Sequence, residues 1–137
     1  MKKVLISGGW DLLHYNHVLT LKRAKSFGDY LVVNVISDER MKLKKGEGRP
    51  FYPLKERMMI LNELRCVDEV ISIPGTEYPL FRAIEQTRPN IVLINTTENQ
   101  DISKEKEFCK KLGVQLIEIE RIDDGVSTTK LINLLRG

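Results

Sequence analysis

The chain has 137 residues, 42% of them hydrophobic and 30% charged, with a formal net charge of +3 at pH 7. This length and apolar content exclude a disordered chain and predict one domain, residues 1–137, with a buried core. No apolar run reaches the roughly 18 residues of a membrane span, and the short N-terminal apolar segment is too short for a signal peptide. We therefore expect a cytoplasmic protein.

The first half of the chain alternates between strand-like and helix-like patterns. A short apolar strand is predicted over residues 4–6. Apolar residues then recur every three positions from Val18 to Phe27, which predicts a helix capped by Gly28. The β-branched run over residues 30–36 is typical of a strand buried on both faces of a parallel sheet. Residues 38–53 are polar and include two glycines and two prolines, so we predict a long functional loop there.

The second half repeats the alternation. A helix is predicted after Pro53, because Leu54, Met58, Leu61 and Leu64 fall on one helical face. Further strands are predicted over residues 69–73, 91–94 and 114–119, and further helices over residues 80–87, 103–113 and 126–135. This order predicts a three-layer α/β fold, with a parallel five-stranded sheet and helices on both faces.

Three polar segments follow predicted strands, where ligands bind in open parallel sheets. The first, Ser7 to His17, contains two glycines that let backbone amides approach an anion before a helix N-terminus. His14 and His17 are three residues apart and suit one face of a helical turn. On these residues alone, a phosphate site, a metal site that includes Asp11 and two partly buried histidines without a ligand all remain open. The glycines do not match the GxGxxG pattern of dehydrogenases.

The second segment is strongly basic. Between residues 40 and 57, seven basic residues face two acidic ones, a balance of +5 against +3 for the whole chain. The basic residues are Arg40, Lys42, Lys44, Lys45, Arg49, Lys55 and Arg57. Such a run is either a solvated surface or a loop that neutralises a polyphosphate.

The third segment, from Asp124 to Lys130, opens the last predicted helix. Its serine and threonines suit helix caps, and the same hydroxyls and amides suit a phosphate.

Together the three segments resemble the cytidylyltransferase-like nucleotidyltransferases of the HxGH superfamily. The Ser7 to His17 segment is similar to their (T/S)GxFDxxHxGH motif. The run from Lys45 to Leu61 resembles the KGxxRPxxPLxxRxxIL stretch of heptose-phosphate adenylyltransferases. The run from Gly125 to Leu131 is similar to the GISTTKI motif of glycerol-3-phosphate cytidylyltransferase. The resemblance covers nearly the whole chain and implies a Rossmann-like nucleotidyltransferase fold.

The resemblance also implies the chemistry. An acceptor phosphate oxygen would attack the α-phosphorus of a nucleoside triphosphate, Mg²⁺ would bridge the phosphates, and pyrophosphate would leave without a protein nucleophile. The residues that it implies for catalysis are His14, His17, Lys45 and Arg57. Those that it implies for nucleotide binding are Ser7, Gly8, Gly9, Trp10, Asp11, His14, His17, Lys44, Ser127, Thr128 and Thr129. No protein metal ligand is predicted.

The basic stretch favours ATP as donor and a sugar phosphate as acceptor, since it is similar to that of the heptose enzymes. CTP with glycerol 3-phosphate or another polyol phosphate is the second alternative, and adenylylation of FMN is the third. The resemblance also implies a homodimer, and we predict no nucleic-acid or membrane partner.

Two departures from the family pattern leave a further alternative open, namely that the chain is a non-catalytic nucleotide-binding module. Asn16 replaces the glycine of HxGH, so it must point away from the nucleotide or reshape that contact. Residues 95–97 replace a Gly-Gly-Asp or Gly-Pro-Asp turn.

Overall fold

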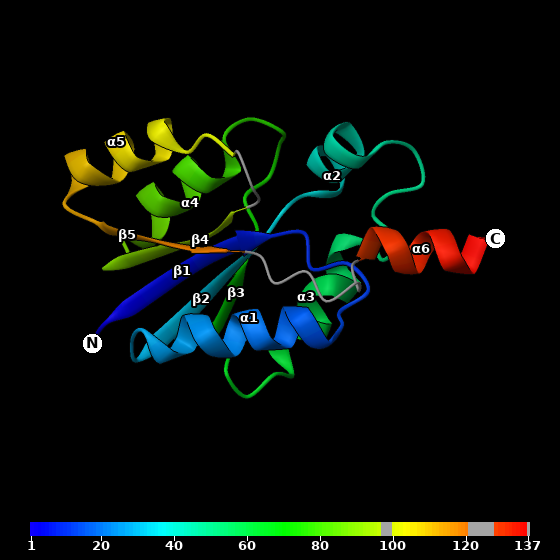
Figure 1. Cartoon of the computed structure of the whole chain (residues 1–137), viewed down its shortest axis with the longest axis horizontal. Helices are drawn as coiled ribbons and strands as arrows, with labels where there is room; N and C mark the ends of the chain where they lie inside the picture. The colour runs from blue at the N-terminus through cyan, green and yellow to red at the C-terminus, as the bar shows by residue number, and fades with distance from the viewer. Residues whose placement is uncertain (97–99, 121–127, 137) are drawn as a thin grey trace.

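The computed structural model describes residues 1–96, 100–120 and 128–136. Within them, parallel strands form one five-stranded sheet in the order β3-β2-β1-β4-β5 (Figure 1). The strands are β1 Lys3–Gly8, β2 Tyr30–Val35, β3 Glu69–Ile71, β4 Ile91–Thr96 and β5 Gln115–Glu120. The predicted α/β fold with a five-stranded parallel sheet is confirmed.

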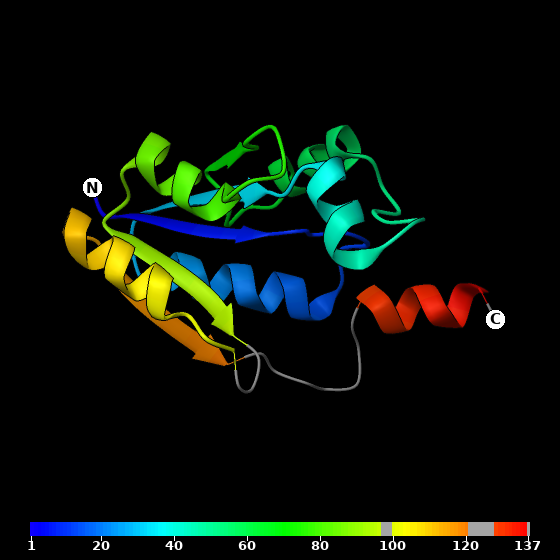
Figure 2. The same ribbon diagram turned by 90° about the horizontal axis from the view of Figure 1, so that it is seen from above.

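Helices cover both faces of the sheet (Figures 1 and 2). One face carries α1 (Tyr15–Ser26) and α3 (Leu54–Asn62), and the other carries α4 (Pro79–Thr87) and α5 (Ser103–Leu112). Successive side chains of a strand point to opposite faces. In β1, Val4 and Ile6 therefore join the core beneath α1 and α3, whereas Leu5 joins the core beneath α4 and α5. All three are at most 1% exposed.

The region predicted as a loop over residues 38–53 is the main departure from the expected fold, because it begins with α2, Asp38–Lys45. The Ser37 hydroxyl caps this helix by accepting a hydrogen bond from the Arg40 N–H at 3.1 Å. Acidic residues fill the first turn and lysines the last, an order that suits the helix dipole. The glycines and prolines that suggested a loop all follow Lys45, and Gly46 ends the helix with a φ of 94°.

The last helix, α6 (Thr128–Arg136), lies beyond the carboxyl ends of the strands (Figures 1 and 2). Arg136 Nη2 donates a hydrogen bond to the carbonyl oxygen of Gly48 at 3.2 Å. The buried side chain of Ile132 anchors the helix. In the described part of the chain, no helix has both the length and the apolar character needed to cross a membrane.

Candidate active site

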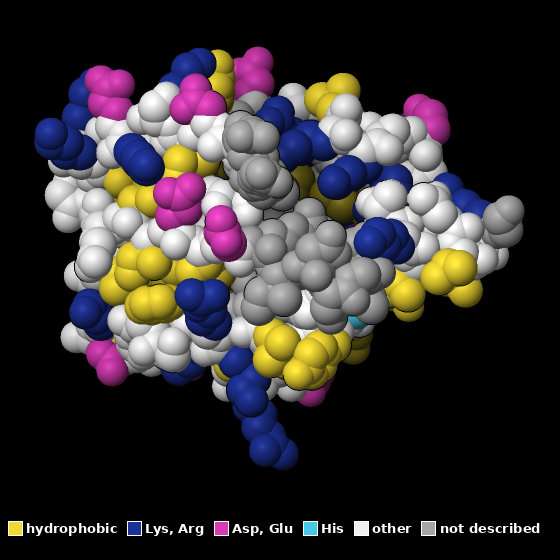
Figure 3. Space-filling view, in the orientation of Figure 1, with side chains coloured by type: hydrophobic (Ala, Val, Ile, Leu, Met, Phe, Trp, Pro, Cys, Tyr) yellow, Lys and Arg dark blue, Asp and Glu magenta, His cyan; other side chains and the backbone are white. Residues whose placement is uncertain are grey.

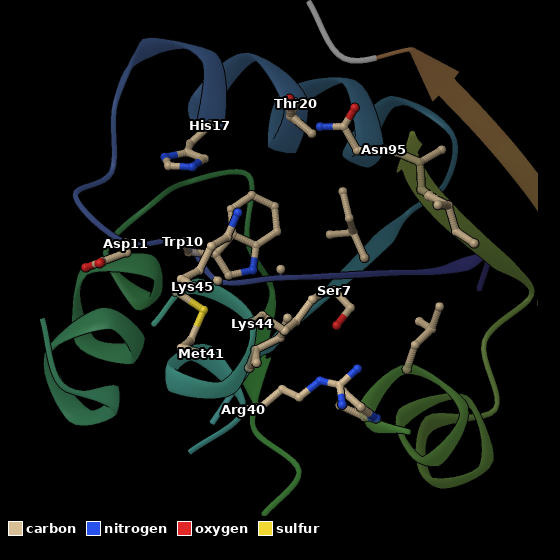
Figure 4. Close-up of a pocket in the computed structure, with 18 of the residues that line it drawn as sticks. Ser7, Trp10, Asp11, His17, Thr20, Arg40, Met41, Lys44, Lys45 and Asn95 are labelled. Carbon is tan, nitrogen blue, oxygen red and sulfur yellow. The ribbon is translucent and has the colours of Figure 1, made fainter. Parts of the chain in front are cut away.

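A cavity of about 660 Å³ opens at the carboxyl ends of β1 and β4 (Figure 4). Its walls come from the loop after β1, the first turn of α1, α2 and the first turns of α4 and α5. Among the predicted site residues, those at positions 7–11, 14, 17, 44, 45 and 129 line it. The fold therefore joins the first polar segment, the basic stretch and the last helix around one space, as expected for an open parallel sheet.

The glycine pair shapes the floor of the cavity through packing. A Cβ atom on Gly8 would lie 2.9 Å from the Trp10 ring, and one on Gly9 would lie 2.7 Å from Met41 Sδ. Trp10 has a φ of 54°, and its indole N–H donates a hydrogen bond to the Asn34 carbonyl oxygen at 3.2 Å. The glycines are therefore required by neighbouring side chains, in addition to leaving backbone amides accessible to an anion.

The two histidines stack at the first turn of α1. Their ring centroids are 3.9 Å apart, with planes inclined by 28°. The backbone N–H of His14 donates a hydrogen bond to His17 Nδ1 at 3.2 Å. An accepting Nδ1 carries no proton, so the neutral His17 ring has its N–H on Nε2. The edge of Trp10 also packs against His17, with centroids 5.7 Å apart, and this contact fixes the ring orientation.

Asp11 positions the basic stretch. Its carboxylate is buried and accepts hydrogen bonds from the backbone N–H groups of Phe51, at 2.6 Å, and Tyr52, at 2.9 Å. Arg49 Nε lies 3.7 Å from the same carboxylate, and Arg49 Nη1 donates to the Thr129 hydroxyl at 3.3 Å. Asp11 and Arg49 thus connect the loop that carries Gly8 and Gly9, here called the glycine loop, with the basic stretch and α6.

Arg57, for which the resemblance implies a catalytic role, is not among the described residues that line the cavity. Its side chain is completely buried and forms an ion pair with Asp38, with Nη2 2.6 Å from Oδ1. Nη1 donates to the carbonyl oxygens of Gly9 and Ile36, each at 2.8 Å, and Nε donates to that of Tyr52 at 2.9 Å. Through these contacts, Arg57 holds the loop that carries Gly8 and Gly9 in place.

Lys44 and Lys45 stand at the end of α2, on the wall that Figure 4 shows beside Met41 and Arg40. Lysine and arginine side chains gather around this part of the surface in Figure 3. Such a wall suits a polyphosphate. Of the hydroxyl residues predicted in the third segment, Thr129 lines the cavity, the Thr128 side chain is not described, and Ser127 lies outside the described residues.

Several cavity residues were not predicted individually. Arg40 and Arg49 lay within the basic stretch, whose charge was the only signal for them. Asn95 lies just after the predicted fourth strand, so its position at a strand end could have indicated it. Asn16 also lines the cavity. No sequence pattern indicated the contributions of α4 and α5.

The described residues contain no group of three or more His, Cys, Asp or Glu side chains arranged to hold a metal ion. The carboxylate of Asp11 is already bonded to backbone amides. Because these residues offer few free carboxylates, they fit a Mg²⁺ ion that would arrive on the nucleotide and be held chiefly by phosphate oxygens.

A family model described as cytidylyltransferase-like matches residues 5–134. The bifunctional protein HldE of Proteus mirabilis is 36% identical over 134 residues, which are 97% of this chain but only 27% of HldE. This chain thus spans about a quarter of that relative. The FAD synthase of Thermococcus sibiricus is 36% identical over 135 residues, 95% of this chain and 89% of the synthase.

Solved structures agree with the sequence matches. The lipopolysaccharide core biosynthesis protein of Thermoplasma volcanium superposes with a TM-score of 0.75 at 28% identity, over 90% of this chain and 99% of that one. Pantothenate synthetase of Thermus thermophilus superposes with a TM-score of 0.64 at 15% identity, over 94% of this chain and 60% of the synthetase. The latter likeness concerns the fold alone. The family resemblance predicted from the motifs is confirmed.

Proposed function

This chain belongs to the cytidylyltransferase-like family and is a nucleotidyltransferase, and we propose that it transfers AMP from ATP to a sugar phosphate. The observation that carries the proposal is the meeting of the glycine loop, the stacked histidines and the lysines of α2 around one cavity. These groups are the donors that a triphosphate requires. The motif similarity to heptose-phosphate adenylyltransferases and the HldE relatives support ATP and a sugar phosphate.

In the proposed reaction, an oxygen of the acceptor phosphate forms a bond to the α-phosphorus of ATP. The bond from that phosphorus to the bridging oxygen breaks, and pyrophosphate leaves with the electron pair. The N–H on His17 Nε2 and the ring of His14 would donate to phosphate oxygens as charge develops on them. Lys44 and Lys45 would hold the triphosphate in line with the acceptor. Mg²⁺, when bound with the nucleotide, would neutralise phosphate charge.

The α6 end of the site would hold the terminal phosphates. Thr129 lines the cavity there, and its hydroxyl already accepts a hydrogen bond from Arg49. Ser127 and Thr128 precede it and would add their amides and hydroxyls, as the family motif implies. The proposed enzyme acts as a cytoplasmic homodimer, with ATP as the donor and no nucleic-acid or membrane partner.

Adenylylation of FMN is the second candidate, and one observation favours it. The FAD synthase relative of Thermococcus sibiricus is as similar to this chain, at 36% identity over 135 residues, as the HldE relative of Proteus mirabilis, at 36% over 134 residues. CTP with glycerol 3-phosphate is the third candidate, supported by the similarity of the last segment to the GISTTKI motif.

Thermal denaturation with ATP, CTP, GTP or UTP, each with Mg²⁺, tests the donor. A ligand at about a hundred times its dissociation constant adds about 2.7 kcal/mol to the free energy of unfolding. We expect ATP to raise the melting temperature most. Pyrophosphate release from ATP is then measured with a heptose phosphate, a hexose phosphate, FMN and glycerol 3-phosphate. Stabilisation by CTP alone contradicts the choice of ATP, and nucleotide binding without pyrophosphate release from any acceptor supports a non-catalytic module.

A further inference from the structure

We infer that Glu105, with Arg40, selects the acceptor: Glu105 accepts a hydrogen bond from an acceptor hydroxyl, and Arg40 binds the acceptor's phosphate. The inference rests on the proposed function and adds the class of acceptor, a phosphate monoester that carries several hydroxyl groups. Both side chains line the cavity.

Glu105 lines the cavity and carries an acceptor atom that has no hydrogen-bond partner in the described residues. It lies in the first turn of α5, and its Oε2 atom is buried without a hydrogen-bond partner in the described residues. A buried carboxylate oxygen without a donor is costly to the folded protein, so such groups are normally satisfied by protein, water or ligand. Because Glu105 lines the cavity, a rotation that turns this oxygen toward the cavity would let a substrate group supply the missing donor.

Neither helix capping nor a surface ion pair accounts for a glutamate at position 105. The start of α5 is already held by Asp101, whose carboxylate accepts hydrogen bonds from the Ser103 N–H at 2.9 Å and the Ser103 hydroxyl at 2.7 Å. Two residues further along the helix, Glu107 is exposed and lies 3.9 Å from Lys111. Glu105 has no such partner among the described residues.

Arg40 supplies the complementary group. Its Nη1 donates to the Thr76 carbonyl oxygen at 2.8 Å, which fixes the guanidinium. Its Nε is buried and donates to no acceptor in the described residues. A held guanidinium with an unused donor suits a phosphate, which accepts several hydrogen bonds. Figure 4 shows Arg40 across the cavity from His17, so its phosphate would be distinct from those beside the histidines.

The basic side chains that line the cavity favour a hydroxyl over an ammonium group. Lys44, Lys104 and Arg40 line the same cavity, and a substrate cation would be repelled by them. A hydroxyl donates to the carboxylate without adding charge. Sugar phosphates and the ribityl phosphate of FMN both carry such hydroxyls.

The test is calorimetric titration of the full chain in the presence of Mg²⁺ and α,β-methylene ATP, which is not cleaved. The titrants are a heptose phosphate, a hexose phosphate, FMN, glycerol 3-phosphate and phosphoethanolamine. We expect a hydroxyl-rich phosphate to bind the wild type, and Glu105→Gln to weaken its affinity about 5- to 10-fold, since a hydrogen bond to a carboxylate is replaced by a weaker one to a neutral amide. Glu107→Gln, the same change on the exposed side of α5, should leave the affinity for that titrant unchanged.

Further readouts separate selection from folding. The affinity for the ATP analogue and the melting temperature should stay unchanged in Glu105→Gln, while the KM for the acceptor rises more than kcat falls. Arg40→Gln should weaken the binding of the same titrant, and the exposed control Lys42→Gln should leave that binding unchanged. The identity of the tightest titrant distinguishes a sugar phosphate from FMN.

The inference is overturned if Glu105→Gln binds the acceptor within twofold of wild type, or if phosphoethanolamine binds best. It also fails if the ATP analogue binds but no hydroxyl-bearing phosphate does, although the nucleotide site then stands. If the analogue itself does not bind, the proposed function fails. In that case, a hydroxyl-bearing phosphate that binds wild type, but binds Glu105→Gln more weakly, still supports the acceptor contact.

Discussion

The guanidinium of Arg57 and the carboxylate of Asp38 form an ion pair 2.6 Å long that joins α3 to the first turn of α2. The arginine side of the pair is fully buried, and the aspartate side chain is 43% exposed. The same guanidinium donates a hydrogen bond to the carbonyl oxygen of Gly9. One side chain therefore ties the basic helix to the glycine loop, the two walls that face the triphosphate in the proposed reaction.

Replacing Arg57 by Leu should lower the free energy of unfolding by at least about 3 kcal/mol, because buried carbonyl oxygens and Asp38 lose their donors together. Urea denaturation measures this loss. Lys55→Leu, at an exposed position of the same helix, is the control and should change the free energy of unfolding little. If Arg57→Leu unfolds like the control but loses turnover, Arg57 contacts phosphate as the family resemblance implied.

Asp11→Asn should loosen the basic stretch without unfolding the chain. An Asn amide keeps one oxygen acceptor but turns an NH₂ group toward a backbone N–H, so one of the two bonds to Phe51 and Tyr52 is lost. We expect a loss of about 1.5–3 kcal/mol in unfolding free energy and a higher KM for ATP. Asp29→Asn, at an exposed carboxylate that accepts from the Lys2 N–H, serves as control. Equal effects of the two variants would contradict a positioning role for Asp11.

The strand pattern and the motif order predicted the sheet and ten of the residues that line the cavity, because both depend on local features. Apolar runs define buried strands, and the ends of parallel strands meet at one edge of the sheet. The buried position of Arg57 was not predicted, because the sequence shows its charge but not the carbonyl oxygens of distant segments that surround it. Glu105 was missed because a glutamate in the first turn of a helix normally indicates only a favourable interaction with the helix dipole.

His17→Ala should reduce turnover about a hundredfold or more, since it removes a donor aimed at charge that develops in the reaction. Single-turnover pyrophosphate release measures the effect, and circular dichroism and the melting temperature verify the fold. His17→Asn, which keeps a hydrogen-bond donor near the same place, should recover part of the rate. Near wild-type turnover in His17→Ala would contradict the role of the stacked histidines.

The two glycines should respond differently to alanine. At Gly8 the new methyl group meets the buried Trp10 ring at 2.9 Å, and at Gly9 it meets the flexible end of Met41 at 2.7 Å. Gly8→Ala should cost about 1–3 kcal/mol of stability through overpacking, whereas Gly9→Ala should cost less because Met41 can move. The double variant Gly9→Ala with Met41→Ala should relieve the crowding at Gly9. Equal destabilisation by the two single variants, measured by urea denaturation, would contradict this packing.

Both cysteines should react slowly with thiol reagents in the folded chain. Burial raises the pKa of the Cys66 thiol and of the Cys109 thiol, so the thiolate that reacts forms only at higher pH than in an unfolded chain. Because the unfolded thiols ionise first, the free energy of unfolding should fall as pH rises above about 8.5, the ordinary pKa of cysteine.

Labelling with Ellman's reagent at pH 8 measures the reactivity, with the chain unfolded in urea as reference. Cys109, which is 1% exposed, should react more slowly than the half-buried Cys66, and the variants Cys66→Ala and Cys109→Ala separate the two signals. Labelling of Cys109 at the rate of the unfolded chain would show that the packing of α5 against the sheet opens readily, and the first turn that carries Glu105 would then lack the fixed position that acceptor selection requires.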